Sequence, residues 1–122
     1  HSFNMTMTEL RTAVEHELAI KVCILNNGYM GMVRQWQELF YKKCYFAVDL
    51  EAGTPDFVKL AEAYGAVGIR VKKRKDLIPA LKKAIKSPCT VLLDIVVVRE
   101  ENIWPMVAAG QSLSDVFGGI ER

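Results

Sequence analysis

Two adjacent asparagines and a glycine, Asn26-Asn27-Gly28, are candidates for holding a metal ion or another ligand. They follow the run Ile20–Leu25, which is short and rich in β-branched residues and predicts a buried strand. In open parallel sheets, ligands bind beyond the carboxyl ends of the strands. An asparagine oxygen is a hard, neutral ligand for Mg²⁺, which completes its shell with phosphates and water. The alternative is a plain turn, because Asn-Gly is a common turn dipeptide.

A second candidate feature lies at the start of the sequence. Ser2–Met5 leads into a predicted helix over Met7–Glu17, with Thr6 as its N-cap and Glu9 completing a capping box. A helix N-terminus is a ready site for an anion. The spacing to the asparagines therefore permits a diphosphate on the helix start and a metal held by Asn27, but does not require them.

Several further elements must position these features. The predicted elements, in chain order, are a helix over Met7–Glu17, a strand over Ile20–Leu25, a helix or broken helix over Gly31–Tyr41, an irregular segment over Lys42–Gly53, a helix over Pro55–Tyr64 ended by Gly65, a strand over Ile69–Val71, a helix over Asp76–Ile85, a strand over Thr90–Val98, and a loop after Arg99. In the helix over Asp76–Ile85, we expect Leu77, Leu81 and Ile85 to point inward. Strands separated by helices predict an α/β fold with a largely parallel sheet. Right-handed crossovers place helices on both of its faces.

The composition bounds the possible partners. The chain has 122 residues, one domain or less, with a formal net charge of +2, too small to indicate a nucleic acid or a membrane partner. The apolar run Val91–Val98 is interrupted by Asp94 and is too short to span a bilayer. The three cysteines form no C-x-x-C pair, so we expect a reducing compartment, with Cys23 buried as a small hydrophobe.

Several stretches together carry a family resemblance. They are Ser2–Leu10 (SFNMTMTEL), Asn26-Asn27, Gly31–Tyr41 (GMVRQWQELFY), Pro55–Gly65 (PDFVKLAEAYG) and Trp104–Val107 (WPMV). A Gly-Asp-Gly motif followed at about this spacing by Asn-Asn is the signature of thiamine-diphosphate enzymes, and the other stretches resemble the acetohydroxyacid (acetolactate) synthases among them. Other thiamine enzymes generally lack the Gly31–Tyr41 run. The resemblance covers essentially the whole chain.

The sequence departs from the family pattern at its start. His1 stands where the last glycine of the motif belongs, and the motif's aspartate, a magnesium ligand in the family, is not among these residues. We therefore expect residues 1–122 to be the C-terminal part of the thiamine-diphosphate-binding domain, truncated at its N-terminal side. The family's catalytic glutamate belongs to another domain. We thus expect no catalytic residue in this chain, and no activity from it alone.

The resemblance implies binding roles for particular residues. The cofactor-binding set is Ser2, Met5, Asn27, Tyr29, Met30, Gly31 and Met32. Within that set, the Asn27 side chain and the Tyr29 backbone carbonyl are the expected magnesium ligands. The expected substrate channel is formed by Met32, Val33 and Trp36, and the tryptophan position is one where inhibitory herbicides bind. Arg34 is given no role beyond surface charge. Without the resemblance, Met and Trp at helical spacing would be interpreted as core.

The resemblance also implies an activity and partners. The expected reaction joins two pyruvates to 2-acetolactate, or pyruvate and 2-ketobutyrate to 2-aceto-2-hydroxybutyrate, with loss of CO₂, in branched-chain amino acid biosynthesis. FAD is expected outside this segment. A homodimer or homotetramer, with a possible regulatory small subunit, is expected in the cytoplasm, or in a plastid or mitochondrion of a eukaryote. The alternatives are another thiamine-diphosphate-dependent 2-keto-acid decarboxylase or oxidase, and a non-catalytic assembly module.

Overall fold

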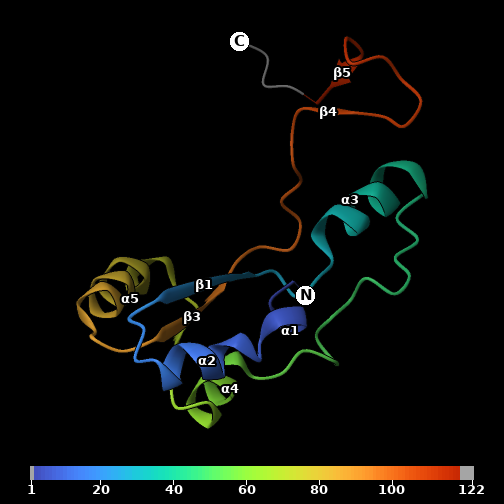
Figure 1. Cartoon of the computed structure of the whole chain (residues 1–122). Helices are drawn as coiled ribbons and strands as arrows, with labels where there is room; N and C mark the ends of the chain where they lie inside the picture. The colour runs from blue at the N-terminus through green and yellow to red at the C-terminus, as the bar shows by residue number, and fades with distance from the viewer. Residues whose placement is uncertain (1, 119–122) are drawn as a thin grey trace.

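A three-stranded parallel sheet lies at the centre of the fold in the computed structural model, which describes residues 2–118 (Figure 1). Its strands are β1 (Lys21–Asn26), β2 (Val67–Val71) and β3 (Val91–Val96), in the order β1-β3-β2. Asn26 lies opposite Val96 and Val71 opposite Ile95, so the three carboxyl ends meet at one edge. This confirms the predicted α/β class and the parallel sheet.

Helices cover both faces of the sheet, as predicted. On one face lie α1 (Ser2–Thr6), α2 (Glu9–Glu15) and α4 (Phe57–Ala63), and on the other lies α5 (Arg74–Lys86) (Figure 1). Successive side chains of a strand point to opposite faces. Leu92 accordingly joins the cluster under α4, whereas Val91 and Leu93 join the cluster under α5. The central strand β3 is therefore apolar on both sides.

The sequence around α4 explains how closely this helix approaches the sheet. Asp56 caps it, since its carboxylate accepts the backbone N–H groups of Val58 and Lys59 at 3.0 and 3.2 Å. The helix thus begins at Phe57, after the predicted Pro55, and ends before Gly65 (φ +86°) as predicted. A Cβ at position 68, which is a glycine in β2, would lie 2.7 Å from the Val58 carbonyl oxygen.

The N-terminal helix differs from its prediction. The chain is already helical from Ser2, so Thr6 closes α1 instead of capping a helix. A turn at residues 7–8 follows, and Thr8, which precedes α2, makes no side-chain cap bond. The capping-box prediction is therefore wrong. Apolar spacing marked the inward face through Leu10 and Ala13 but could not show where the helix is interrupted.

Two residues predicted to be buried are exposed. Ile85 is 72% exposed because Ala84 takes the inward position on α5. The inward residues of α5 are Leu77, Ala80, Leu81 and Ala84. Cys23 is exposed because β1 is an edge strand and α5 packs against β2 and β3 instead. The predictions for these two side chains were wrong, although the elements that carry them are present.

Helix α3 (Gly31–Phe40) lies away from the sheet and beside the chain that follows β3 (Figure 1). The sequence predicted only a loop after residue 99, but this segment contains a short antiparallel pair, β4 (Met106–Val107) and β5 (Val116–Phe117). Aromatic rings join it to α3, with Phe117 5.9 Å from Trp104 and 6.4 Å from Phe40 between centroids. Over residues 2–118, no helix has the length and apolar character needed to cross a membrane.

Candidate functional site

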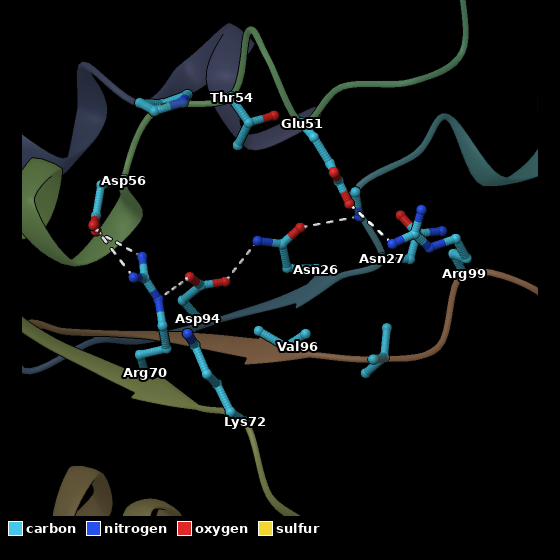
Figure 2. A pocket seen from close by; sticks show the side chains of 13 residues that line it. Asn26, Asn27, Glu51, Thr54, Asp56, Arg70, Lys72, Asp94, Val96 and Arg99 are labelled. Atoms are coloured by element: carbon cyan, nitrogen blue, oxygen red, sulfur yellow. Dashed lines mark hydrogen bonds and ion pairs between the residues drawn. The ribbon is translucent and has the colours of Figure 1, made fainter.

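A polar hollow of about 580 Å³ lies at the carboxyl edge of the three strands (Figure 2). Its polar lining includes Asn26, Asn27, Asp56, Arg70, Lys72, Asp94 and Arg99. The asparagine pair therefore lies where the parallel sheet was expected to bind a ligand.

A chain of paired charges crosses the floor of this hollow. Asp94 of β3 is 1% exposed and accepts hydrogen bonds from Asn26 Nδ2 and Arg70 Nε, each at 2.9 Å (Figure 2). The remaining guanidinium nitrogens of Arg70 donate to Asp56 at 2.7 and 3.2 Å. Hydrogen bonding to Arg70 lowers the pKa of Asp56, and hydrogen bonding to Asp56, then to Asp94, raises the pKa of Arg70. Such pairing is what allows the Asp94 carboxylate to be buried.

The asparagines form a tight turn that is closed by their own side chains. Asn26 Oδ1 accepts the N–H of Gly28, and Asn27 Oδ1 accepts the N–H of Tyr29, both at 3.1 Å. Gly28 has φ +70°, a conformation that favours glycine. A Cβ at Gly31 would lie 3.0 Å from Asn27 Nδ2. The segment is therefore a turn, as the plain alternative held, and it is placed at the ligand-binding edge of the sheet.

The ring of Tyr29 connects this turn to α3 and to the segment after β3. The guanidinium of Arg34 lies 5.7 Å from the ring centroid, and that of Arg99 lies 5.4 Å from it. Arg34 is only 7% exposed, donates to Glu38 at 2.8 Å and lies 4.8 Å from the Tyr45 ring centroid. The prediction that Arg34 is merely a surface charge is wrong: it is a packed cation at the junction of three segments.

The residues predicted to form a substrate channel lie together on α3. Met32, Val33 and Trp36 line one apolar hollow of about 670 Å³, together with Gln37, Tyr41, Cys44 and Phe46. Met32 is 47% and Val33 42% exposed, so these two side chains are not core. The hollow is separate from the polar one, and no residue lines both.

The other predicted cofactor residues are spread over two elements. Met30 precedes α3 and donates its N–H to the Val48 carbonyl at 2.9 Å, and Gly31 is the first residue of α3. Ser2 and Met5 lie in α1, and neither lines the polar or the apolar hollow. Their roles toward a cofactor stay predictions.

The donor atoms around the turn fit a hard cation. Over the described residues 2–118, no cluster of three or more His, Cys, Asp or Glu residues is placed to hold a metal ion. The oxygens that remain are those of the Asn27 amide and the Tyr29 carbonyl, which suit Mg²⁺ when phosphates and water complete its shell. In α1, Asn4 Oδ1 is buried and has no hydrogen-bond partner among the described residues.

Sequence reasoning missed the charged residues of the polar hollow, among them Arg70 and Asp94, which pair with each other. One signal was present, because Asp94 interrupts the most hydrophobic predicted strand. An aspartate is almost never fully buried unless it is paired. The sequence offered no comparable signal that Arg70 was the partner, since it could equally have faced solvent.

Comparison with known proteins identifies the family. Residues 1–95 match the family described as "Thiamine pyrophosphate enzyme, C-terminal TPP binding domain". The chain is 46% identical over 117 residues to an acetolactate synthase of Arthrospira platensis, covering 96% of this chain and 20% of that protein. It is 45% identical over 117 residues to the acetolactate synthase large subunit of Cyanidium caldarium, with the same coverage. The chain thus spans about a fifth of the length of these relatives.

A solved structure shows the same fold. The thiamine diphosphate-dependent 4-hydroxybenzoylformate decarboxylase of Rhodococcus jostii RHA1 superposes with a TM-score of 0.72 at 29% sequence identity. The match covers 80% of this chain and 18% of that one.

Proposed function

Since the chain belongs to the thiamine pyrophosphate enzymes, through their C-terminal TPP-binding domain, we propose that it is the thiamine-diphosphate- and Mg²⁺-binding segment of an acetolactate synthase. One observation carries this assignment: about 45% identity to acetolactate synthases extends over 96% of the chain. Identity to the structurally similar decarboxylase is 29%. We propose further that residues 1–122 are the C-terminal part of that domain, with its remaining ligands supplied elsewhere.

Each predicted residue has a task in this proposal. The Asn27 side-chain oxygen and the Tyr29 carbonyl hold Mg²⁺, and the magnesium holds the cofactor's diphosphate. Ser2 and Met5 contact the diphosphate, while Met30, Gly31 and Met32 border the cofactor. The glycine fits this place because a side chain there would crowd the Asn27 amide.

The apolar hollow on α3 has a separate task, which is to receive the substrate. Met32, Val33 and Trp36 present an apolar surface that excludes water from the reacting carbon. Thiamine diphosphate, when bound, supplies the electron sink that loss of CO₂ from a 2-keto acid requires. The chain's own residues hold and shield it, and none of them is proposed as a catalytic acid, base or nucleophile. The segment alone is therefore proposed to be inactive.

The proposal for the whole protein reaches beyond this segment, because the relatives are about five times as long. It converts pyruvate, alone or with 2-ketobutyrate, to 2-acetolactate or 2-aceto-2-hydroxybutyrate with loss of CO₂. FAD binds outside this segment. The protein forms a homodimer or homotetramer, with a regulatory small subunit as a further partner. Its place is the cytoplasm, or a plastid or mitochondrion if the source is a eukaryote.

Calorimetric titration of the chain with thiamine diphosphate tests the binding role. We expect binding that requires Mg²⁺ and that weakens by at least about tenfold in Asn27→Ala, because a ligand to the metal is lost. Asn102→Ala is the matched control, since it makes the same change outside both hollows and should leave the affinity unchanged.

Two results would count against the proposal. A Mg²⁺-dependent affinity for thiamine diphosphate that is the same in Asn27→Ala, measured in the full-length polypeptide, contradicts the binding role. In the full-length polypeptide, acetaldehyde or acetyl phosphate as the product, instead of acetolactate, favours a decarboxylase or an oxidase.

A further inference from the structure

The side chain of Asn26 has one permitted orientation, and Asp94 sets it. The ionised carboxylate of Asp94 can only accept hydrogen bonds, and the backbone N–H of Gly28 can only donate one. Asn26 lies between them, with Nδ2 2.9 Å from Asp94 Oδ1 and Oδ1 3.1 Å from the Gly28 nitrogen (Figure 2). Rotating the amide by half a turn would set oxygen against oxygen and donor against donor. The two neighbours together therefore allow only the observed orientation.

Asp94 is itself held from both sides. Its second carboxylate oxygen accepts a hydrogen bond from Arg70 Nε at 2.9 Å. Arg70 in turn donates hydrogen bonds to both oxygens of Asp56, at 2.7 and 3.2 Å. Asp56 is the N-cap of α4. The Asn26 amide is thus held in position by a chain of hydrogen bonds through β3, β2 and the N-terminus of α4, and the core fixes the positions of these elements. The carboxylate cannot turn away without breaking its ion pair with Arg70.

The orientation of Asn26 decides the geometry of the turn that follows. Its oxygen accepts the Gly28 N–H and so favours the positive φ of Gly28. Within the same turn, Asn27 Oδ1 accepts the Tyr29 N–H, which fixes the Asn27 side chain relative to the Tyr29 carbonyl. These are the two oxygens proposed to bind Mg²⁺.

We propose that Asp94 is a positioning residue for the metal site. It does not touch the metal, but it acts through Asn26 to preorganise the Asn27 and Tyr29 oxygens. Groups that orient metal ligands in this way typically change metal affinity by roughly 10- to 100-fold when they are removed. The inference rests on the proposed function, because it needs magnesium at the turn.

The isosteric variant Asp94→Asn tests it in two measurements on the whole chain. Hydrogen exchange of the Gly28 amide, followed by NMR, reports the Asn26 orientation without any ligand. Titration of Mg²⁺ at fixed thiamine diphosphate reports the metal site. We expect faster exchange at Gly28 and about a tenfold higher Mg²⁺ requirement. Asp76→Asn on α5 is the matched control and should change neither value.

The variant Asn26→Ala shows whether Asp94 acts through Asn26. It leaves the Asp94–Arg70 pair intact, so it is expected to fold, and it should reproduce both changes. The double variant should be no worse than either single variant, because both remove the same connection. If Asp94→Asn does not fold, Asn26→Ala alone decides.

The outcomes separate the two proposals. Unprotected Gly28 exchange in the unaltered chain, or a normal Mg²⁺ requirement in Asn26→Ala, overturns the positioning role while the binding function stands. Additive effects in the double variant also overturn it, since they would show that Asp94 acts by another route. An affinity of the full-length polypeptide for thiamine diphosphate that is the same with and without Asn27→Ala overturns the proposed function, and the positioning role falls with it.

Discussion

Two regions of this molecule are held together by different means. The sheet with α1, α2, α4 and α5 is packed around two clusters of buried aliphatic side chains, with Leu92 and Leu93 of β3 both 0% exposed. The region formed by α3 and residues 99–118 has no such cluster. The amide of Gln35, 1% exposed, donates to the Ile103 carbonyl and accepts the Ile103 N–H, both at 2.9 Å. Aromatic pairs add further contacts.

This difference matters because the two proposed tasks fall in different regions. The metal-binding turn is attached to the rigid sheet edge through Asn26 and Asp94, whereas the apolar hollow is built on α3. A metal site needs fixed geometry, and the sheet provides it. The α3 region has no cluster of buried aliphatic side chains, so it can separate from the sheet by local opening with little loss of buried apolar area.

Tryptophan fluorescence can distinguish the unfolding of the two regions of this chain. Its two tryptophans, Trp36 and Trp104, both lie in the α3 region, whereas most helix and strand residues lie in the sheet region. Tryptophan fluorescence therefore follows the α3 region, and far-UV circular dichroism follows mainly the sheet region. Unfolding in urea should show the fluorescence change at a lower concentration than the dichroism change.

Leu92→Ala should produce the largest effect, and in the sheet region. Leu92 is fully buried among residues of α2, α4 and β1, which cannot all move inward to fill the space. We expect a loss of about 3 kcal/mol in the free energy of unfolding, measured by dichroism in urea. Leu113→Ala makes the same change at a residue that is 87% exposed and should cost less than about 0.5 kcal/mol. Equal losses in the two variants would contradict the assigned core.

Gln35→Ala should give a smaller effect, confined to the α3 region. It leaves the N–H and C=O of Ile103 without their partner, at a cost of about 2 kcal/mol. The fluorescence transition should move to lower urea concentration while the dichroism transition stays in place. Coincident shifts of both transitions would show that the two regions unfold as one unit.

Gln37 offers a matched control for that variant. Its amide makes the same pair of bonds to the backbone of Phe46, both at 3.0 Å, but at an exposed position. Water can replace those bonds, so Gln37→Ala should cost less than about 1 kcal/mol. The difference between the two losses in the free energy of unfolding reports how much burial adds to the value of such an amide pair.

The same contrast explains what the sequence could predict. Periodicity located most of the helices and all three sheet strands, because β3 and the inward faces of α4 and α5 owe their burial to local patterns such as Leu77–Leu81. The asparagine turn was predicted at the correct edge for the same reason. The short β4–β5 pair was missed, since it depends on ring contacts between residues as distant as Phe40 and Phe117.

Errors at single residues have a common physical origin. Arg34 was predicted to be a surface charge, yet it is buried. The rings of Tyr29 and Tyr45, which lie outside α3, pack against its guanidinium, and Glu38 on the next turn of α3 pairs with it. Cys23 follows a buried pattern but lies on an edge strand. A pattern shows which residues are apolar; it does not show which neighbour covers them.

Acidification should change the stability of the chain least, and this change should be confined to the sheet region. Arg70 lowers the pKa of Asp56 below its ordinary value of about 3.9. The folded state therefore binds this proton more weakly than the unfolded state. The resulting stabilisation is fully present above about pH 5 and is lost as the pH falls below 4, through the lowered pKa. The effect is small because the Asp56 side chain is 37% exposed.

Asp56→Asn distinguishes this charge effect from the capping of α4, since asparagine is as good an N-cap as aspartate. The variant should melt below the unaltered chain at pH 7, when followed by dichroism, and the gap should close as the pH falls toward 2.5. The fluorescence transition of the α3 region should show no such closing gap, because Asp56 and Arg70 both belong to the sheet region. A gap that stays constant with pH would assign the loss to packing and leave the Asp56–Arg70 pair without a role in acid stability.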